Sequence, residues 1–433
     1  MSRQQVIDLD RRHVWRPYTA VRTQQQEEPL VIERAEGAYL IEADGRRFLD
    51  ANGSWWANNL GHSHPRVVAA LKAQAERLMH CSLGVITHAP AAELAAELVR
   101  FAPPGLGRVF FSDNGSTAVE VAIKMAYQYF RQNGAPERRR FVSLGGAFHG
   151  DTLGAMSVSG VDAFRQHFGD LLFEVWHTPK AGADEAWRDA IDALQQHLQH
   201  AGSDVAAVIV EPLVQGAGGM QIWPAALLRA LADSTRAAGS LLIADEVFTG
   251  MGRTGMPWAC MHAGITPDLL CTAKWLSGGA LPFAATLATE RLYQGFAGGS
   301  ERALLHGHTF TGNPLGAAVA LEVLRIYADE DLLTRAQTHG AKLRHFAASL
   351  QGQPGLQRPR SLGMIFAVDL GGGGYHAKDG WRVHQEALKR GVYLRPLGNV
   401  VYLVPPLVLT DTELETMLTA VAESLSVVRT ARG

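Results

Sequence analysis

Short apolar runs alternate with amphipathic, alanine-rich stretches over most of the chain after residue 65. The helix-like stretches include VVAALKAQAERL (67–78) and PAAELAAELVRF (90–101). The apolar runs are RVFFS (108–112), RFVSL (140–144), VAAVIV (205–210), LLIAD (241–245) and DLLCTA (268–273). Short apolar strands separated by helices are typical of a parallel sheet buried on both faces. The pattern continues to about residue 325 and predicts an α/β fold with a mostly parallel central sheet.

The two ends of the chain follow a different pattern. Three short β-like segments, LVIER, AYLIE and RFLD, fill residues 30–50 and predict a small antiparallel meander. Toward the C-terminus a long helical stretch is followed by the strand-like runs MIFAVDL, VYLRP and VVYLVP and by a helix near residues 411–428. We therefore expect a large domain at residues 60–325 and a smaller α+β domain built from residues 1–59 with 326–433.

Composition excludes several classes of partner. The 40 Lys and Arg residues nearly balance the 42 Asp and Glu residues, giving a net charge of −2. Such a chain offers no strongly basic surface for nucleic acid or an anionic membrane. The three cysteines form no CxxC pair, and no apolar run is long enough for a signal peptide or a membrane span. We expect a soluble cytoplasmic protein without nucleic-acid or membrane partners.

Two motifs point to ligands that their context does not support. GMGRTG (250–255) matches GxGxxG, but the strand before it ends five residues earlier and Met-Pro-Trp follows it. This context favours an active-site loop over a dinucleotide site. The His-x-His pairs at 62–64 and 306–308 have no cysteine or carboxylate cluster beside them. We expect these histidines to make hydrogen bonds and expect no metal site.

Lys274 is the most informative single residue. It follows an apolar strand and lies between Ala273 and Trp275. A lysine desolvated in such surroundings has a lowered pKa and can act as a nucleophile or form a Schiff base. A lysine that extends from a strand end to solvent is the simpler interpretation of this residue alone. The small residues Ser-Gly-Gly at 277–279 favour the first interpretation, because they let the backbone approach a bulky ligand.

Asp245 ends the apolar strand before that of Lys274. The carboxyl ends of strands in an open parallel sheet face the ligand crevice. Asp245 and Lys274 would therefore present a carboxylate and an amine to one cavity. An aspartate that caps the next turn is an equally good interpretation until Lys274 is considered.

The segment SDNGST (112–117) follows a strand and opens an amphipathic helix. Thr117 and Glu120 fit a capping box. Gly115 and the neighbouring hydroxyl groups at a helix N-terminus predict an anion-binding site. A plain N-cap would explain the serine and threonine but does not need the glycine.

An imine-forming lysine, an aspartate for a ring nitrogen and a phosphate cup together suit pyridoxal 5′-phosphate. At these residues the chain resembles the class III (ω) aminotransferases of fold-type I, and the resemblance covers nearly its whole length. The motifs that carry it occur in order: DNGSTAVE, GAFHGDT, VEPLVQGAGG, IADEV, TAKWLSGG and HGHTFTGNP. The resemblance implies a pyridoxal-phosphate-dependent aminotransferase with a large domain and a smaller domain formed by both chain ends.

The resemblance also implies roles at the reacting end of the site. Lys274 would form the Schiff base with the cofactor and carry a proton to and from the substrate carbon. Asp245 would keep the pyridine nitrogen protonated, which makes the ring an electron sink. Phe148 would stack on the ring and also contact substrate.

At the phosphate end the resemblance involves two subunits. Gly115 and Ser116 would bind the phosphate of their own subunit. His308 would flank and bind the cofactor, and Thr309 beside it would reach the phosphate of the neighbouring subunit. The resemblance therefore implies a homodimer in which each site needs both chains.

Three further stretches resemble one branch of the family: WRPYT (15–19), SWWA (54–57) and LRP (394–396). That branch transfers an amino group from S-adenosylmethionine to 8-amino-7-oxononanoate, giving 7,8-diaminononanoate by a ping-pong mechanism in biotin biosynthesis. Two adjacent tryptophans suit a long apolar chain, and Arg395 suits its distal carboxylate. The implied substrate contacts are Tyr18, Trp55, Trp56, Phe148, Gly307 and Arg395.

Some alternatives stay open. Ala217 stands where relatives acting on ornithine or 4-aminobutyrate commonly have a glutamate, which favours a pocket for an acyl tail. Phe148 and His308 stand where that branch often has tyrosine and proline, so lysine or another amine remains possible as amino donor. The alternative enzyme is a broad ω-amine or ω-amino-acid:pyruvate transaminase. A non-catalytic regulatory protein that binds the cofactor is disfavoured, because the lysine and the aspartate are both present.

Overall fold

The structure is a computed structural model that describes residues 1–182, 184–372 and 374–430. Its largest element is a seven-stranded sheet in the order β4-β12-β11-β10-β7-β5-β6. β12 runs antiparallel to both of its neighbours, and the other pairs are parallel. The strands are β4 (Leu106–Ser112), β5 (Arg140–Gly145), β6 (Val175–Lys180), β7 (Val205–Val210), β10 (Leu241–Asp245), β11 (Leu269–Thr272) and β12 (Ala284–Thr289). The predicted mostly parallel sheet is confirmed.

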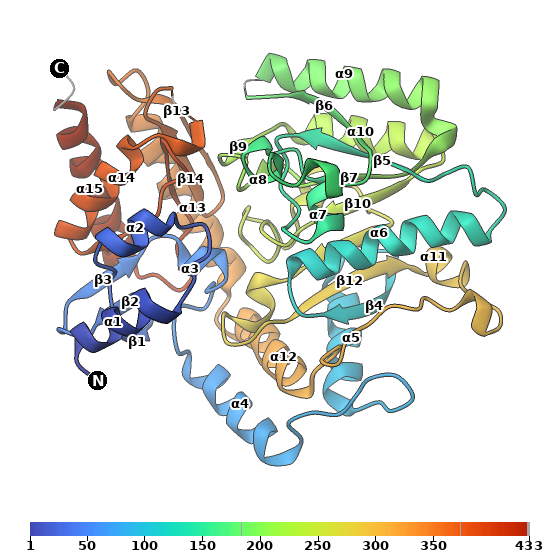
Figure 1. Cartoon of the computed structure of the whole chain (residues 1–433), viewed down its shortest axis with the longest axis horizontal. Helices are drawn as coiled ribbons and strands as arrows, with labels where there is room; N and C mark the ends of the chain where they lie inside the picture. The colour runs from blue at the N-terminus through green and yellow to red at the C-terminus, as the bar shows by residue number, and fades with distance from the viewer. Residues whose placement is uncertain (183, 373, 431–433) are drawn as a thin grey trace.

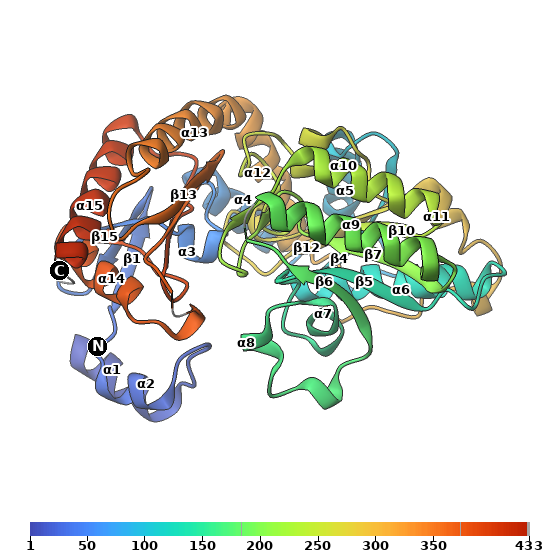
Figure 2. The same cartoon turned by 90° about the horizontal axis from the view of Figure 1, so that it is seen from above.

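Helices cover both faces of this sheet, which explains its apolar strands. β7, β10 and β11 are buried along their whole length, as expected for strands without a solvent face. Figure 2 shows α5, α9 and α10 on one side of the sheet and α6 and α7 on the other. The covering helices are α5 (Ala89–Phe101), α6 (Gly115–Gln132), α7 (Leu153–Val158), α9 (Asp184–Ala201) and α10 (Ala225–Ala237). α12 (Pro314–Asp329) packs against α5 and against α4 (Pro65–Arg77).

Both ends of the chain lie together on one side of the large sheet (Figure 1). The predicted antiparallel meander is present as β1 (Ile32–Glu36), β2 (Tyr39–Glu42) and β3 (Arg47–Asp50). β15 (Val392–Tyr393) extends this sheet by pairing in parallel with β3. A second sheet contains β13 (Gln357–Leu362), β14 (Ile365–Asp369) and β16 (Val400–Leu403). The domain boundaries at 60–325 and at 1–59 with 326–433 stay a prediction.

The helices of this smaller part surround its two sheets. α1 (Arg3–His13) and α2 (Val21–Gln26) lie on the outside of the smaller part, close to the N-terminus (Figures 1 and 2). α13 (Leu332–Ser349) packs on β13 and β14, and α14 (Asp379–Lys389) packs on β15 and on α15 (Asp411–Thr430). In the part of the chain that the structure describes, we find no helix with the length and apolar character that a membrane crossing requires.

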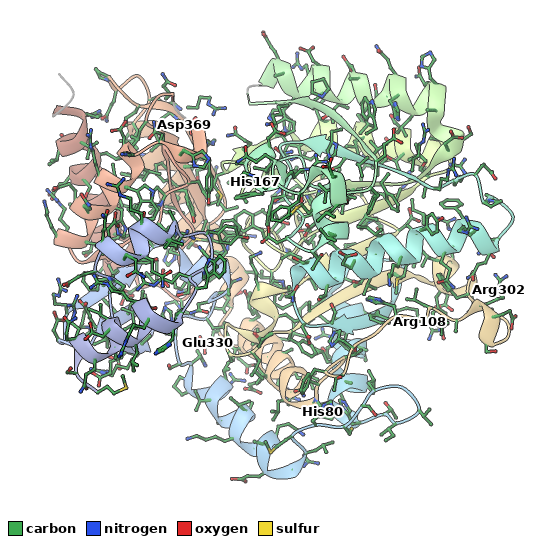
Figure 3. All side chains as sticks on the ribbon, in the orientation of Figure 1. His80, Arg108, His167, Arg302, Glu330 and Asp369 are labelled. Atoms are coloured by element: carbon green, nitrogen blue, oxygen red, sulfur yellow. The ribbon has the colours of Figure 1, made fainter. Side chains whose placement is uncertain are left out.

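An arginine fixes the second sheet against the large part. Asp369, labelled in Figure 3, lies at the end of β14 and accepts a hydrogen bond from Arg360 at 2.9 Å. The Arg360 guanidinium also donates to the carbonyl oxygens of Gly219 and Met220 at 2.7 and 2.8 Å. These carbonyls lie between β8 (Val214–Gln215) and β9 (Gln221–Ile222). The motif VQGAGG is thereby joined to the C-terminal part of the chain.

Candidate active site

The candidate residues collect at one edge of the large sheet, where its parallel strands end. Asp245 closes β10 and pairs with Cys271 of the neighbouring parallel strand β11, two residues before Ala273 and three before Lys274. The prediction that Asp245 and Lys274 share one edge is therefore confirmed. Three further segments follow strands at this edge: Gly115 follows β4, Phe148 follows β5 and Glu211 follows β7.

Asp245 is buried and its carboxylate is fixed in orientation. Its Oδ2 lies 2.7 Å from His149 Nδ1, and its Oδ1 accepts the backbone N–H of Val247 at 3.1 Å. The His149 backbone N–H donates to Ser159 Oγ at 2.8 Å, which anchors the histidine. His149 was not among the candidates predicted from the sequence, although its place in the motif GAFHGDT beside Phe148 is a usable signal.

Lys274 has the environment that its sequence context predicts. Its Nζ lies 5.3 Å from the centroid of the Trp56 ring and has no hydrogen bond or ion pair within the described residues. Burial lowers the pKa of the Lys274 amine, while the charges of Asp245 and Glu211 act in the opposite direction. Its φ of 40° is a backbone conformation that residues other than glycine seldom adopt. Strain of this kind gathers at functional sites.

Glu211 is a buried carboxyl group that the sequence analysis did not select. Its side chain accepts the backbone N–H groups of Phe148 at 2.8 Å and Gly216 at 3.0 Å. Burial raises the pKa of Glu211 to about 7. The residue therefore connects the loop after β5 to the VQG segment. A glutamate directly after a fully apolar strand was the available signal.

Helix α6, whose start is the predicted phosphate cup, has a different N-cap residue from the one expected. Asn114 is the N-cap: its side chain accepts the N–H of Thr117 at 3.0 Å, and Thr117 Oγ1 accepts the N–H of Asn114 at 3.0 Å. The predicted capping box of Thr117 with Glu120 is therefore wrong. Glu120 instead accepts hydrogen bonds from Thr152 Oγ1 at 2.6 Å and from the N–H of Gly154 at 2.9 Å.

The first turn of α6 leaves room for an anion. The N–H groups of Gly115 and Ser116 have no acceptor within the helix, because a helix has no carbonyl before its first turn. A Cβ at Gly115 would lie 2.7 Å from a Val247 methyl group, so only glycine fits there. The N–H of Asp151 donates to Ser116 Oγ at 3.2 Å. Free amides at the positive end of a long helix favour phosphate.

Arg395 and the two tryptophans form the other end of the site. The Arg395 guanidinium lies 4.8 Å above the Trp55 ring and has no carboxylate partner within the described residues. The Tyr18 ring meets Trp55 edge-on at 5.6 Å, and its hydroxyl donates to Asp151. Trp55 and Tyr18 keep 42% and 47% of their surface exposed. A ligand can therefore reach the arginine and both rings.

A group of aromatic rings connects Tyr18 to the strand edge. The Phe164 ring, from α8 (Asp162–Arg165), lies 5.8 Å from Tyr18, 5.4 Å from Phe148 and 5.2 Å from Tyr375. Sequence reasoning missed Phe164 and Tyr375. No local signal marks them, because their contacts join segments far apart along the chain.

The segment HGHTF lies beside the phosphate cup. His308 Nδ1 is 3.3 Å from Asp113 Oδ2, just before the start of α6. Gly307 and Thr309 are exposed. The structure thus places Thr309 at the surface near the cup of its own chain, and its predicted role across a subunit interface stays a prediction.

The His-x-His pairs make polar contacts, as predicted, and the active-site role of the loop at 250–255 stays a prediction. The histidines make polar contacts: His62 with Asp50 at 3.0 Å and His64 with Glu330 (Figure 3) at 3.3 Å. Residues 250–255 form successive turns. Among the residues that the structure describes, no group of three or more His, Cys, Asp or Glu side chains is arranged to hold a metal ion.

The arrangement fits pyridoxal 5′-phosphate. An amine without a partner, a buried carboxylate held by a histidine and an open helix N-terminus surround the same strand edge. Lys274 would bind the cofactor aldehyde and Asp245 the ring nitrogen. Gly115 and Ser116 would hold the phosphate, and Phe148 would cover the ring. Together the fold and these groups define a pyridoxal-phosphate-dependent aminotransferase.

The profile of the class-III aminotransferases matches residues 20–425, and the chain belongs to this family, whose cofactor is pyridoxal 5′-phosphate. It is 47% identical to the adenosylmethionine-8-amino-7-oxononanoate aminotransferase of Synechococcus elongatus over 95% of this chain and 98% of the relative. The crystal structure of the same enzyme from Methanocaldococcus jannaschii superposes with a TM-score of 0.94, at 35% identity, over 98% of this chain and 99% of that one. An amine transaminase from an uncultivated Pseudomonas species, solved with the cofactor bound, superposes with a TM-score of 0.90, at 34% identity, over 96% and 98% of the two chains. The expected α/β fold of fold-type I is confirmed.

Proposed function

We propose that this protein transfers an amino group from S-adenosylmethionine to 8-amino-7-oxononanoate and so produces 7,8-diaminononanoate for biotin biosynthesis. The observation that carries the proposal is the pair Trp55 and Trp56. One ring lies under the Arg395 guanidinium and the other lies near the Lys274 amine. The acceptor has a carboxylate at one end, a ketone near the other and an apolar chain between them. The site has the Arg395 guanidinium at one end and the Lys274 amine at the other, and the two tryptophan rings form the apolar wall between them.

Pyridoxal 5′-phosphate, when bound, supplies an aldehyde that combines with amines and a ring that accepts electrons. The residues of this chain bind it and move the proton. Burial lowers the pKa of the Lys274 amine and so favours its neutral form. The neutral Nζ can take a proton from the substrate carbon and return it. Asp245 holds the proton on the ring nitrogen, and His149 keeps the Asp245 carboxylate in place. Arg395 binds the distal carboxylate and thereby orients the ketone.

The proposal includes a homodimer in the cytoplasm. Large apolar side chains are exposed at both ends of the HGHTF segment, at Leu305 and Phe310, and His80 packs beside Phe310 with ring centroids 4.8 Å apart. Exposed apolar side chains gathered in this way favour a protein interface. A second copy of the chain would cover them and would bring its own Thr309 to the phosphate. Mixing Lys274→Ala subunits with Thr309→Ala subunits tests this arrangement.

The function is tested by following each half-reaction of the holoenzyme separately. S-adenosylmethionine should discharge the visible absorbance of the bound cofactor, and 8-amino-7-oxononanoate should then restore it. Lysine and simple arylalkylamines should act more slowly as donors. Faster discharge by an arylalkylamine, with recovery by pyruvate, would instead support the ω-transaminase. A colourless protein that takes up no added cofactor would support the regulatory alternative.

Arg395→Ala should weaken acceptor binding selectively. Loss of a charge-assisted hydrogen bond to a carboxylate costs about 1.5–3 kcal/mol, so kcat/KM for 8-amino-7-oxononanoate should fall about 10- to 150-fold, mainly through KM. The donor half-reaction should change much less. Arg390, which pairs with Glu386 and Glu423 away from the site, provides the control Arg390→Ala. An equal loss in both half-reactions would contradict the role of Arg395 as a carboxylate clamp.

A further inference from the structure

The turn that carries the two tryptophans is left-handed throughout. Gly53, Ser54, Trp55 and Trp56 have φ values of 53°, 46°, 60° and 72°. The N–H of Trp56 donates to the Asn52 carbonyl and that of Ala57 to the Gly53 carbonyl, each at 2.9 Å. L-amino acids normally adopt this conformation only as single residues. Interactions outside the turn must therefore hold it.

A buried carboxylate supplies these interactions. Asp50, at the end of β3, has no exposed surface. Its Oδ2 accepts the Ser54 hydroxyl at 2.8 Å, and its Oδ1 accepts the Asn52 N–H at 3.1 Å. His62 Nε2 lies 3.0 Å from the same Oδ2. His62 Nδ1 faces the Asn58 side-chain amide at 2.8 Å. Because that amide donates, Nδ1 accepts, and Nε2 carries the proton that it donates to Asp50.

The same group of residues reaches the backbone of the carboxylate clamp. The Asn52 side-chain oxygen accepts the N–H of Arg395, and its Nδ2 donates to the Tyr402 carbonyl at 3.2 Å. The Tyr402 hydroxyl accepts Trp56 Nε1–H at 3.3 Å. The turn and the start of the Arg395 side chain are thus held by one connected set of hydrogen bonds.

The two tryptophans face opposite ends of the proposed substrate. Trp56 packs on Phe248, with ring centroids 4.4 Å apart, and its ring lies near Lys274 Nζ. Trp55 lies under the Arg395 guanidinium. The backbone that joins the tryptophans therefore fixes how far the apolar wall extends between the amine and the guanidinium.

We propose that Asp50 and His62 are positioning residues that set the chain length of the carboxylated oxo substrate by holding this left-handed turn. Neither side chain lies on the wall itself; both act through the turn and through Asn52. The inference rests on the proposed function, because it assumes an acceptor that reaches from Lys274 to Arg395. It predicts that disturbing the Asp50 contacts changes which acid is preferred and leaves the chemistry at Lys274 intact.

Ser54 provides a matched pair of variants. Ser54→Ala removes the hydroxyl bond to Asp50 and keeps the cost of a positive φ. Ser54→Gly removes the same bond, but glycine adopts this φ freely. Holoenzymes of both variants, of Asp50→Asn and of the natural sequence are compared with 8-amino-7-oxononanoate and with homologues one methylene shorter and longer. A pocket of fixed length discriminates such homologues by about 10- to 200-fold.

We expect Asp50→Asn and Ser54→Ala to reduce this preference to less than about threefold, while Ser54→Gly retains most of it. The donor half-reaction with S-adenosylmethionine should stay near that of the natural sequence in all three. The inference is overturned if Asp50→Asn lowers kcat/KM equally for every chain length, or if the alanine and glycine variants behave alike. If Asp50→Asn does not fold, the Ser54 pair decides. A natural sequence inactive with all three acids would contradict the proposed function instead.

Discussion

Lys274→Ala is expected to lower turnover by at least about 10⁴-fold, because general acid–base catalysis by a positioned group contributes up to that factor and the same amine also binds the cofactor. The visible absorbance of the bound cofactor should be lost or shifted in the variant. Both half-reactions and the absorbance spectrum of the purified protein measure these effects.

Lys72, exposed on α4, provides the control Lys72→Ala, which should behave like the natural sequence. Turnover near normal in Lys274→Ala would contradict the assignment of the catalytic amine. The variant also tests the dimer when it is mixed and refolded with Thr309→Ala. If Thr309 crosses the interface, a hybrid dimer contains one site with both natural residues, and activity should return. Mixed subunits that stay inactive would contradict the shared site.

Asp245→Asn should lower kcat by about 10²–10³-fold, the usual loss when one preorganised electrostatic contact to the reacting system is removed. The amide cannot carry the negative charge that keeps a ring nitrogen protonated. The cofactor should still bind, because the phosphate cup at Gly115 and Ser116 is unchanged. Steady-state rates and the amount of bound cofactor per chain check the two parts of this expectation.

His149→Asn provides a graded comparison for Asp245→Asn. It removes the 2.7 Å contact to Asp245 Oδ2 but leaves the carboxylate itself. Its loss of kcat should therefore be smaller than that of Asp245→Asn. Asp245→Asn with a normal kcat, or a larger loss in His149→Asn, would show that the carboxylate is not the group that matters.

The clearest strand predictions from the sequence fall on strands that are buried on both faces. VAAVIV and LLIAD are apolar at every position except the final aspartate, and the structure buries them fully. β6 was missed because its sequence VWHTPK is half polar. β12 was missed because AATLAT contains mainly alanine and threonine. Burial there comes from neighbouring elements, which the local pattern does not contain.

The residues of the candidate site also divide into those that the sequence predicted and those that it did not. Lys274 and Asp245 could be predicted because each follows its own apolar strand, and the topology of a parallel sheet brings such residues together. His149 and Glu211 carry local signals too, but their contacts with Asp245 and with the Phe148 and Gly216 amides depend on which loops meet at this edge. The cap of α6 was assigned wrongly because Thr117 and Asn114 both fit N-cap preferences. The extended φ and ψ of Asn114, −152° and 171°, decide between them.

The pairing of β15 with β3 places Asp50 opposite Tyr393, two residues before Arg395. The apolar wall is therefore encoded near the start of the chain and its carboxylate clamp near the end. During synthesis, a nascent chain presents the two tryptophans, the phosphate cup, Asp245 and Lys274 before it presents Arg395. Under the proposed function, the binding site for the acceptor carboxylate is therefore completed only when translation is nearly finished.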